Sequence, residues 1–127
     1  MWATDAYCLD RAQDRRLLAL LEAQSACGYV TYLLASTLEE VQAYFERDIR
    51  QTPTEAPEGT IIYLEQLEGT WNRALRRQVW DYMTTQHPQW TLGVWYRQTP
   101  RGWRRYIVRR EGDFHGQDVP GPCRYTR

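Results

Sequence analysis

The sequence contains no lysine, because all sixteen of its basic residues are arginine. Without lysine the chain has no Walker A phosphate loop, no Schiff-base chemistry and no nuclease site built on a carboxylate–lysine pair. Serine occurs only at Ser25 and Ser36, and neither lies in the Gly-x-Ser-x-Gly pattern of a nucleophile elbow. No Gly-x-Gly-x-x-Gly follows an expected strand, so a dinucleotide site has no support. We therefore expect a protein that is not an enzyme and has no cofactor.

Cysteine is limited to Cys8, Cys27 and Cys123, and no Cys-x-x-Cys is present. This spacing supports neither a zinc ribbon nor a redox pair, and free thiols are typical of a reducing compartment. No apolar run reaches the roughly 18 residues that a membrane helix needs. The first residues show no basic segment followed by an apolar one, which argues against a secretory signal. We expect a cytoplasmic protein with no membrane association.

Charge and tryptophan are unevenly distributed, although the formal net charge is zero. Residues 1–70 hold five arginines against twelve acidic residues, and residues 71–127 hold eleven against four. Five of the six tryptophans also lie in the second segment. Arginine suits bidentate contact with carboxylate or phosphate, although a GC-rich coding bias produces the same preference over lysine. The opposed charges also favour head-to-tail self-association or docking to another charged protein.

The apolar pattern predicts a single domain, residues 1–127, of the α/β class, with α+β as the alternative. Leu17, Leu20 and Leu21 recur at helical spacing, and Thr37 with Glu40 forms a capping box at the start of a second helix. The order α-β-α-β-α-β-β predicts a mixed sheet of about four strands that ends in an antiparallel hairpin. The expected elements are helix 6–25, strand 29–34, helix 37–50, strand 60–65, helix 70–86 with Thr70 as N-cap, strands 90–97 and 103–110, and an irregular tail over 111–127.

The hairpin carries the most specific functional signal. Pro100 at the second position and Gly102 at the fourth of Thr99-Pro100-Arg101-Gly102 are typical of a type I turn. This turn places Trp95 opposite Tyr106 and Arg97 opposite Arg104, all on one face. Like charges directly across a ladder repel unless an anion neutralises them or water screens them. If a helix covers this face, the aromatic rings belong to the core and the arginines reach the rim.

We expect a non-enzymatic protein-binding module, an adaptor, assembly factor or inhibitor, because Trp, Tyr and Arg are the usual anchors of protein interfaces. The alternative is a single-stranded nucleic-acid or RNA-binding protein that uses the same surface, since stacked rings bordered by guanidinium groups also suit bases and phosphates. The candidate binding residues are Trp95, Arg97, Trp103, Arg104, Arg105, Tyr106 and Arg110 on the hairpin, and Arg73, Arg76 and Arg77 on the third helix.

A further alternative is a metal-dependent enzyme that uses Asp113, His115 and Asp118. These residues fall within six positions of the C-terminal tail, and an imidazole beside carboxylates can hold a divalent metal or serve as a base. A solvated histidine beside aspartate in a glycine-flanked tail is, however, a far commoner arrangement. We therefore list no metal among the expected cofactors.

Overall fold

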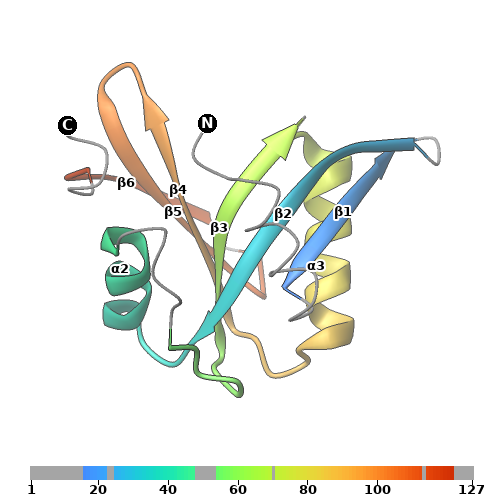
Figure 1. Ribbon diagram of the computed structural model, residues 1–127, viewed down its shortest axis with the longest axis horizontal. Coiled ribbons are helices and arrows are strands. Elements are labelled where there is room, and N and C mark those ends of the chain that lie inside the picture. Colours follow the sequence, from blue (N-terminus) through green and yellow to red (C-terminus); the bar gives the residue numbers. More distant parts are fainter. Residues whose placement is uncertain (1–15, 23–24, 48–53, 70, 113, 122–127) are drawn as a thin grey trace. The chain divides into compact units, whose positions relative to one another are not determined.

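A computed structural model of the chain describes residues 16–22, 25–47, 54–69, 71–112 and 114–121. These residues form six strands and two helices, and the strands make one sheet in the order β1-β2-β3-β4-β5-β6 (Figure 1). The sheet is mixed: β1–β2, β4–β5 and β5–β6 are antiparallel, whereas α3 connects β3 to its neighbour β4 as in a parallel crossover. The elements are β1 (Leu17–Glu22), β2 (Ser25–Ala35), α2 (Leu38–Glu46), β3 (Ile61–Gly69), α3 (Arg73–Gln86), β4 (Leu92–Thr99), β5 (Gly102–Arg109) and β6 (Phe114–Val119).

This architecture contradicts the predicted order of three helices and four strands. Residues 17–22, assigned above to helix 6–25, form β1, which pairs with β2; residues 6–15 lie outside the described residues. Leucine and alanine prefer helices, but this preference amounts to less than about 1 kcal/mol per residue and tertiary context overrides it. In β1 the pairing with β2 and the nearly complete burial of Leu20 favour the strand.

The tail expected to be irregular contains a sixth strand. β6 pairs with β5 in an antiparallel register that sets Gly116 opposite Tyr106 and Asp118 opposite Arg104. At Gly116 a Cβ would lie 2.7 Å from Arg104 Nε. The glycine therefore makes room for a side chain, which is a recognised use of glycine inside a strand.

Three local predictions can be compared directly with the structure. Thr37 and Glu40 form the predicted capping box: Thr37 Oγ1 accepts from Glu40 N, and Glu40 Oε1 accepts from Thr37 N, both at 3.1 Å. The hairpin register is also confirmed, since Trp95 pairs with Tyr106 and Arg97 with Arg104. The predicted N-cap of the third helix is wrong, because Asn72 caps α3 by accepting from Leu75 N at 3.0 Å.

The described residues form two compact units, and the first takes in those of Met1–Leu33 and Leu64–Pro88. Helix α3 lies alongside β1 in this unit (Figure 1) and buries a stripe of apolar side chains. Gly69, with φ of 98°, comes so close to Gly28 that a Cβ on it would lie 2.6 Å from the Gly28 Cα. The buried stripe of α3 consists of Leu75, Val79 and Met83.

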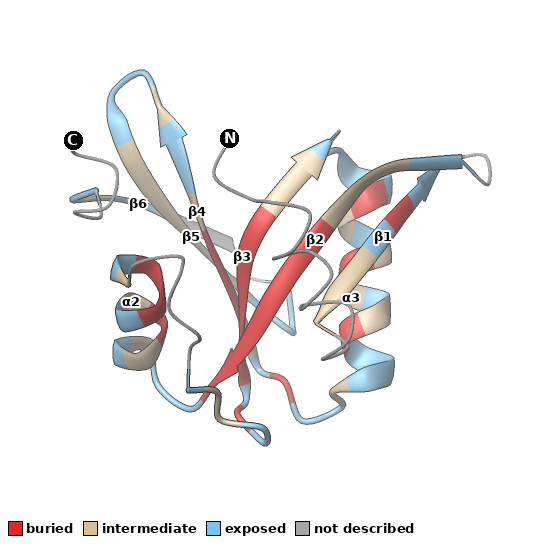
Figure 2. Cartoon of the chain, in the orientation of Figure 1, coloured by how far each residue is buried: buried red, intermediate tan, exposed pale blue. Residues whose placement is uncertain are grey.

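The second unit takes in the described residues of Leu34–Tyr63 and Gln89–Arg127. Its core is an aromatic cluster centred on Phe45 of α2, which stacks on Tyr96 with ring centroids 3.7 Å apart and planes within 4°. Trp103 meets Phe45 edge-on at 5.3 Å. Figure 2 shows the consequence for the hairpin: part of β4 is buried, whereas the turn is exposed. The hairpin is thus anchored at one end and open at the other.

Candidate functional site: the arginine face of the β4–β5 hairpin

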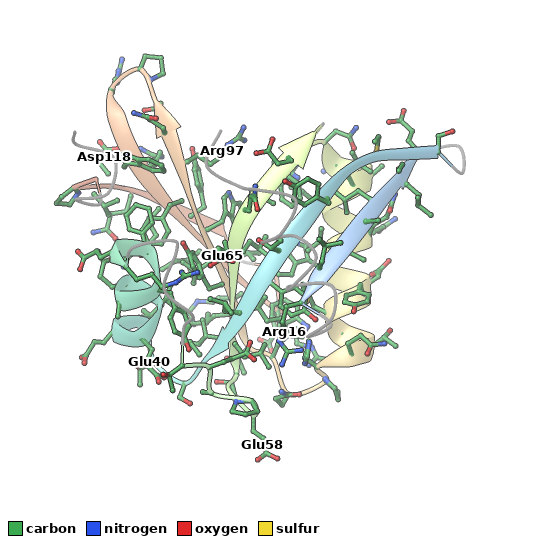
Figure 3. The ribbon with its side chains drawn as sticks, in the orientation of Figure 1. Arg16, Glu40, Glu58, Glu65, Arg97 and Asp118 are labelled. Atoms are coloured by element: carbon green, nitrogen blue, oxygen red, sulfur yellow. The ribbon has the colours of Figure 1, made fainter. Side chains whose placement is uncertain are left out.

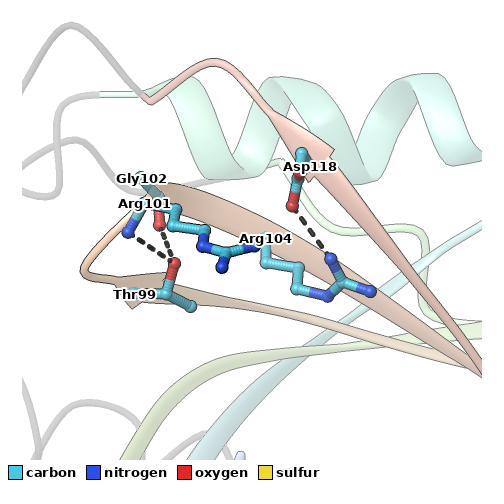
Figure 4. Close-up of polar contacts among 5 residues, drawn as sticks. All are labelled: Thr99, Arg101, Gly102, Arg104 and Asp118. Carbon is cyan, nitrogen blue, oxygen red and sulfur yellow. Dashed lines mark hydrogen bonds and ion pairs between the residues drawn. The ribbon is translucent and has the colours of Figure 1, made fainter.

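The hairpin closes through a two-residue loop, Pro100-Arg101, stabilised by Thr99. Its hydroxyl donates to the Gly102 carbonyl at 2.8 Å and accepts from Arg101 N at 3.2 Å (Figure 4). Gly102 has φ of 118°, which glycine adopts at little cost and other residues rarely adopt. This turn sets the register that brings Arg97 and Arg104 directly opposite each other.

The two faces of the hairpin differ in chemistry. We call the face that carries Trp95, Arg97, Arg104 and Tyr106 the arginine face. Trp103 does not belong to it, because its odd separation from Arg104 and Tyr106 along β5 places it on the opposite face, where it contacts Phe45. A Cβ on Gly121 would lie 2.5 Å from Trp103 Cδ1, so the end of the described chain also contacts this ring. Trp103 therefore packs within the fold.

Trp95 is buried, with only 3% of its surface exposed. Its ring stacks on Tyr106 with centroids 5.5 Å apart and planes 17° apart. The Arg104 guanidinium in turn lies 5.7 Å from the centre of the Tyr106 ring, and Tyr106 is half-buried. The sequence left open whether this aromatic pair is exposed or covered. The structure shows that Trp95 is a core residue, so it presents no ring to a partner.

β6 supplies the anion that the Arg97–Arg104 pair requires. Arg104 Nη1 donates to Asp118 Oδ1 at 2.9 Å, and the side chains are 40% and 81% exposed (Figure 4). Arg97 is exposed and makes no ion pair with any residue that the structure describes. Figure 3 places Arg97 on β4 and Asp118 on β6, both toward the turn end of the hairpin. Asp118 thus neutralises Arg104 alone, and the pair keeps one positive charge on Arg97.

Two further candidate residues of the hairpin, Arg105 and Arg110, bind within the fold. Arg105 lies across from Tyr96 and donates from Nη2 to Gln117 Oε1 at 2.8 Å; its buried Nε has no hydrogen-bond partner among the described residues. Burial raises the pKa of the Tyr96 hydroxyl, and Arg105 partly opposes this rise. Arg110 Nη1 donates to the Trp90 carbonyl at 3.3 Å, and its guanidinium lies 5.7 Å from the centre of the Trp90 ring.

Arg73, Arg76 and Arg77 lie in the first turns of α3, in the other compact unit. The first turn of α3 contains no acidic residue, although acidic residues suit the positive end of a helix macrodipole and arginines do not. Arg73 and Arg77 are exposed, and none of the three forms an ion pair within the described part of the chain. They constitute a basic patch of the first unit, whose charge opposes local helix stability.

Of the three residues suggested for a metal site, the structure describes the side chain of Asp118 alone. Asp113 lies outside the described residues. In β6 the backbone of His115 pairs with Ile107, and that of Asp118 pairs with Arg104. Asp118 is bound to Arg104. The described ranges contain no group of three or more His, Cys, Asp or Glu side chains that could hold a metal ion.

A polar contact in the first unit was not foreseen. His87 is the C-cap of α3, and its Nε2 lies 2.9 Å from the Tyr32 hydroxyl. Burial raises the pKa of this hydroxyl strongly; Tyr82 adds to the rise and Arg16 opposes it. The phenol therefore keeps its proton at neutral pH and serves as a hydrogen-bonding link between β2 and the end of α3. No local sequence signal pairs two residues that are 55 positions apart.

Comparisons with known proteins add no functional assignment. Within the described residues, no helix is both long enough and apolar enough to cross a membrane. No protein-family model matches the sequence, and no curated protein is significantly similar to it. The hairpin residues described above are therefore the basis for assigning a function.

Proposed function

We propose that this chain is a protein-binding module that docks an acidic segment of a partner on the arginine face. The observation that supports this proposal is the incomplete neutralisation of an arginine pair: Arg97 and Arg104 lie directly opposite each other, and Asp118 binds only Arg104. Arginine binds carboxylates in a bidentate manner, and a partner carboxylate would relieve the remaining repulsion. In this proposal the protein acts in the cytoplasm as an adaptor, assembly factor or inhibitor.

The burial and packing of the aromatic residues favour a protein partner over single-stranded nucleic acid. Proteins that bind single strands stack successive bases on open aromatic faces. Trp95 is buried and Trp103 is packed against Phe45, so neither ring meets this requirement. The third ring, Tyr106, is half-buried and lies between Trp95 and the Arg104 guanidinium, so it offers no fully open face. The rest of the arginine face is charge and hydrogen-bond donors, which suit an acidic peptide. Because Arg105 and Arg110 are bound within the fold, the surface is small, as in a transient interface.

A fluorescent peptide of alternating glutamate and glycine tests the proposal, with a single-stranded oligonucleotide as the competing probe. We expect the peptide to bind and the variants Arg97→Ala and Arg104→Ala to weaken binding. Arg73→Ala is the matched control, because it removes the same charge from an exposed position on α3. Equal losses in all three variants would show that only total charge matters and would overturn the proposed site.

The oligonucleotide distinguishes the alternative function. Nucleic-acid binding through arginine releases counterions, so its affinity falls steeply as salt rises. Tight binding of the oligonucleotide with that salt response, together with no binding of the peptide, would replace the proposal by the nucleic-acid alternative. Affinity capture from the native host, with and without nuclease, then identifies the partner itself.

A further inference from the structure

Strand β1 lies at one edge of the sheet that the described residues form, and its sequence is unusual for an edge. From Leu17 to Leu21 it contains only leucine and alanine, and Glu22 is its one charged residue. Natural proteins blunt edge strands with charge, proline or bulges, because the free backbone groups of an edge readily pair with another chain. The β1–β2 register shifts once, between Leu20 and Leu21, but β1 itself contains no proline and a single charged residue. An apolar edge strand therefore points to a pairing partner.

The hydrogen bonds show which residues of β1 present their backbone groups outward. Tyr32 N donates to the Arg16 carbonyl at 3.0 Å, so the backbone of Arg16 faces β2. Because backbone groups alternate along an antiparallel strand, those of Leu17, Ala19 and Leu21 face away from β2. Gln78 of α3 supports this assignment, since its side-chain amide accepts from Leu21 N at 3.0 Å and donates to the Leu21 carbonyl.

The side chain of Gln78 thus takes the place that a peptide group of a neighbouring strand would occupy. Leu21 itself is 49% exposed and is the only large hydrophobic side chain that is exposed among the described residues. The outward backbone of β1 thus already binds an amide group, as it would in a sheet. The exposed leucine is a second, independent sign that this edge pairs with another strand.

We propose that β1 pairs antiparallel with β1 of a second copy of this chain, with Ala19 opposite Ala19 at the two-fold axis. This register sets Leu17 against Leu21 of the second copy, twice, and covers the exposed leucine. It also sets Arg16 against Glu22 of the second copy, twice. The outward groups of three residues in each copy then form about six hydrogen bonds.

The match between the strand and itself identifies a second copy as the occupant. Leu17 and Leu21 each lie two residues from Ala19, and the opposite charges of Arg16 and Glu22 each lie three residues from it. The strand is therefore complementary to an antiparallel copy of itself. In the single chain Arg16 lies at the start of β1 (Figure 3), and its guanidinium is 5.5 Å from the centre of the Tyr32 ring. Gln78 leaves Leu21 when the strands pair, so it opposes dimerisation and keeps it concentration-dependent.

Sedimentation of the full chain over a range of concentrations tests the proposal. We expect a reversible dimer that Ala19→Pro abolishes, since proline removes an outward N–H while the bonds to β2 remain. Gln78→Ala should tighten the dimer by about tenfold or more, because neither copy then gives up the two hydrogen bonds to its own glutamine. A chain that stays monomeric in both the wild type and Gln78→Ala would overturn the proposal.

A charge exchange tests the register independently of any loss of folding. Arg16→Glu and Glu22→Arg should each dimerise more weakly than the wild type, because each homodimer places like charges opposite each other. An equimolar mixture should form a heterodimer in which both charge pairs are restored. Thermal unfolding of each variant verifies its fold. A mixture that associates no better than the separate variants would overturn the register.

One further variant separates edge pairing from association through the opposed charges of the two sequence halves. Arg97→Ala alters the arginine face and leaves β1 untouched, so the dimer should persist. A dimer that is lost in Arg97→Ala and retained in Ala19→Pro would show that the copies meet through the hairpin. The inference does not depend on the proposed function, and either can fail alone.

Discussion

Arg104 and Asp118 are cross-strand partners on β5 and β6, joined by a hydrogen bond of 2.9 Å beside Gly116. Asp118 relieves part of the repulsion between Arg104 and Arg97, the pair that the turn places opposite each other. Because Asp118 is a carboxylate bound to Arg104, it also resembles the group that an acidic partner would present. The ion pair therefore both stabilises the hairpin and competes with the proposed ligand.

Asp118→Asn should raise the affinity for the acidic peptide by about threefold or more, since removing the competing charge frees Arg104. The free energy of unfolding should fall by less than about 1 kcal/mol, because exposed ion pairs contribute little, and this loss should shrink at high salt. Peptide titration and urea unfolding at two salt concentrations measure both effects. Unchanged peptide affinity would mean that Asp118 does not compete with the ligand.

Trp95→Ala should destabilise the protein by about 3–5 kcal/mol, because it removes a large buried ring and leaves a cavity. Arg97→Ala, two residues further along the same face, should change the free energy of unfolding by no more than about 0.5 kcal/mol. Urea unfolding of the two variants compares a core residue with a surface residue on one strand. If Trp95→Ala unfolded like the wild type, the burial of this ring would be wrong.

Thr37→Ala should lower the free energy of unfolding by about 1 kcal/mol, since it removes the hydroxyl that caps the Glu40 amide. Glu39→Ala is the matched control: it also lies in the first turn of α2 but takes no part in the capping box. Glu39→Ala should lower the free energy of unfolding by only about 0.3–1 kcal/mol, because it removes the interaction of Glu39 with the helix macrodipole and no hydrogen bond of the capping box. Chemical unfolding of both variants measures the difference, and a larger loss in Glu39→Ala would contradict the capping role.

Alkaline pH should destabilise the fold. Burial raises the pKa of Tyr32, Tyr44 and Tyr96 above the ordinary value of 10.0, so the folded state holds these protons more tightly than the unfolded state. Their stabilising contribution is complete below pH 10 and is lost as the pH rises above it. The free energy of unfolding from pH 8 to 11.5 should therefore decline, and Tyr32→Phe should reduce the slope. A flat profile would contradict the raised pKa values.

Gly69→Ala should be much more damaging than Gly112→Ala. Both glycines have positive φ, 98° and 106°, so either substitution strains the backbone by about 1–3 kcal/mol. A Cβ on Gly69 would also lie 2.2 Å from the Cys27 carbonyl oxygen, whereas a Cβ on Gly112 would meet nothing within 4 Å. Comparing the melting temperatures of the two variants isolates the cost of the close approach between strands. Equal melting temperatures would mean that the close approach of Gly69 to Cys27 adds no cost to the substitution.

The accuracy of the sequence-based expectations depended on the range of the interactions involved. The capping box of Thr37 and Glu40 and the register of Trp95 with Tyr106 were predictable, because each depends on residues close together in the chain. β1 was mistaken for a helix because the spacing of its leucines fits either structure until its partner strand is known. β6 was missed because the reason for Gly116 is Arg104, twelve residues away on another strand.

The same distinction between local and distant interactions applies to the candidate site. Turn chemistry alone placed Arg97 opposite Arg104, but it could not reveal that Asp118 lies beside Arg104 or that Trp95 is buried. Trp103 was grouped with Trp95 as an anchor, although the alternation of the strand already separates the two faces.

By itself, the sequence determined the chemistry that a lysine-free chain lacks, the start of α2 and the pairing of the hairpin. These follow from residue types and from hydrogen bonds between near neighbours, which need no knowledge of the remaining chain. Only the tertiary structure decided that residues 17–22 form a strand, that β6 completes the sheet, and which hairpin face keeps its arginines exposed. Strand pairing and burial depend on segments that are distant in sequence, and local preferences are too weak to specify which segments meet.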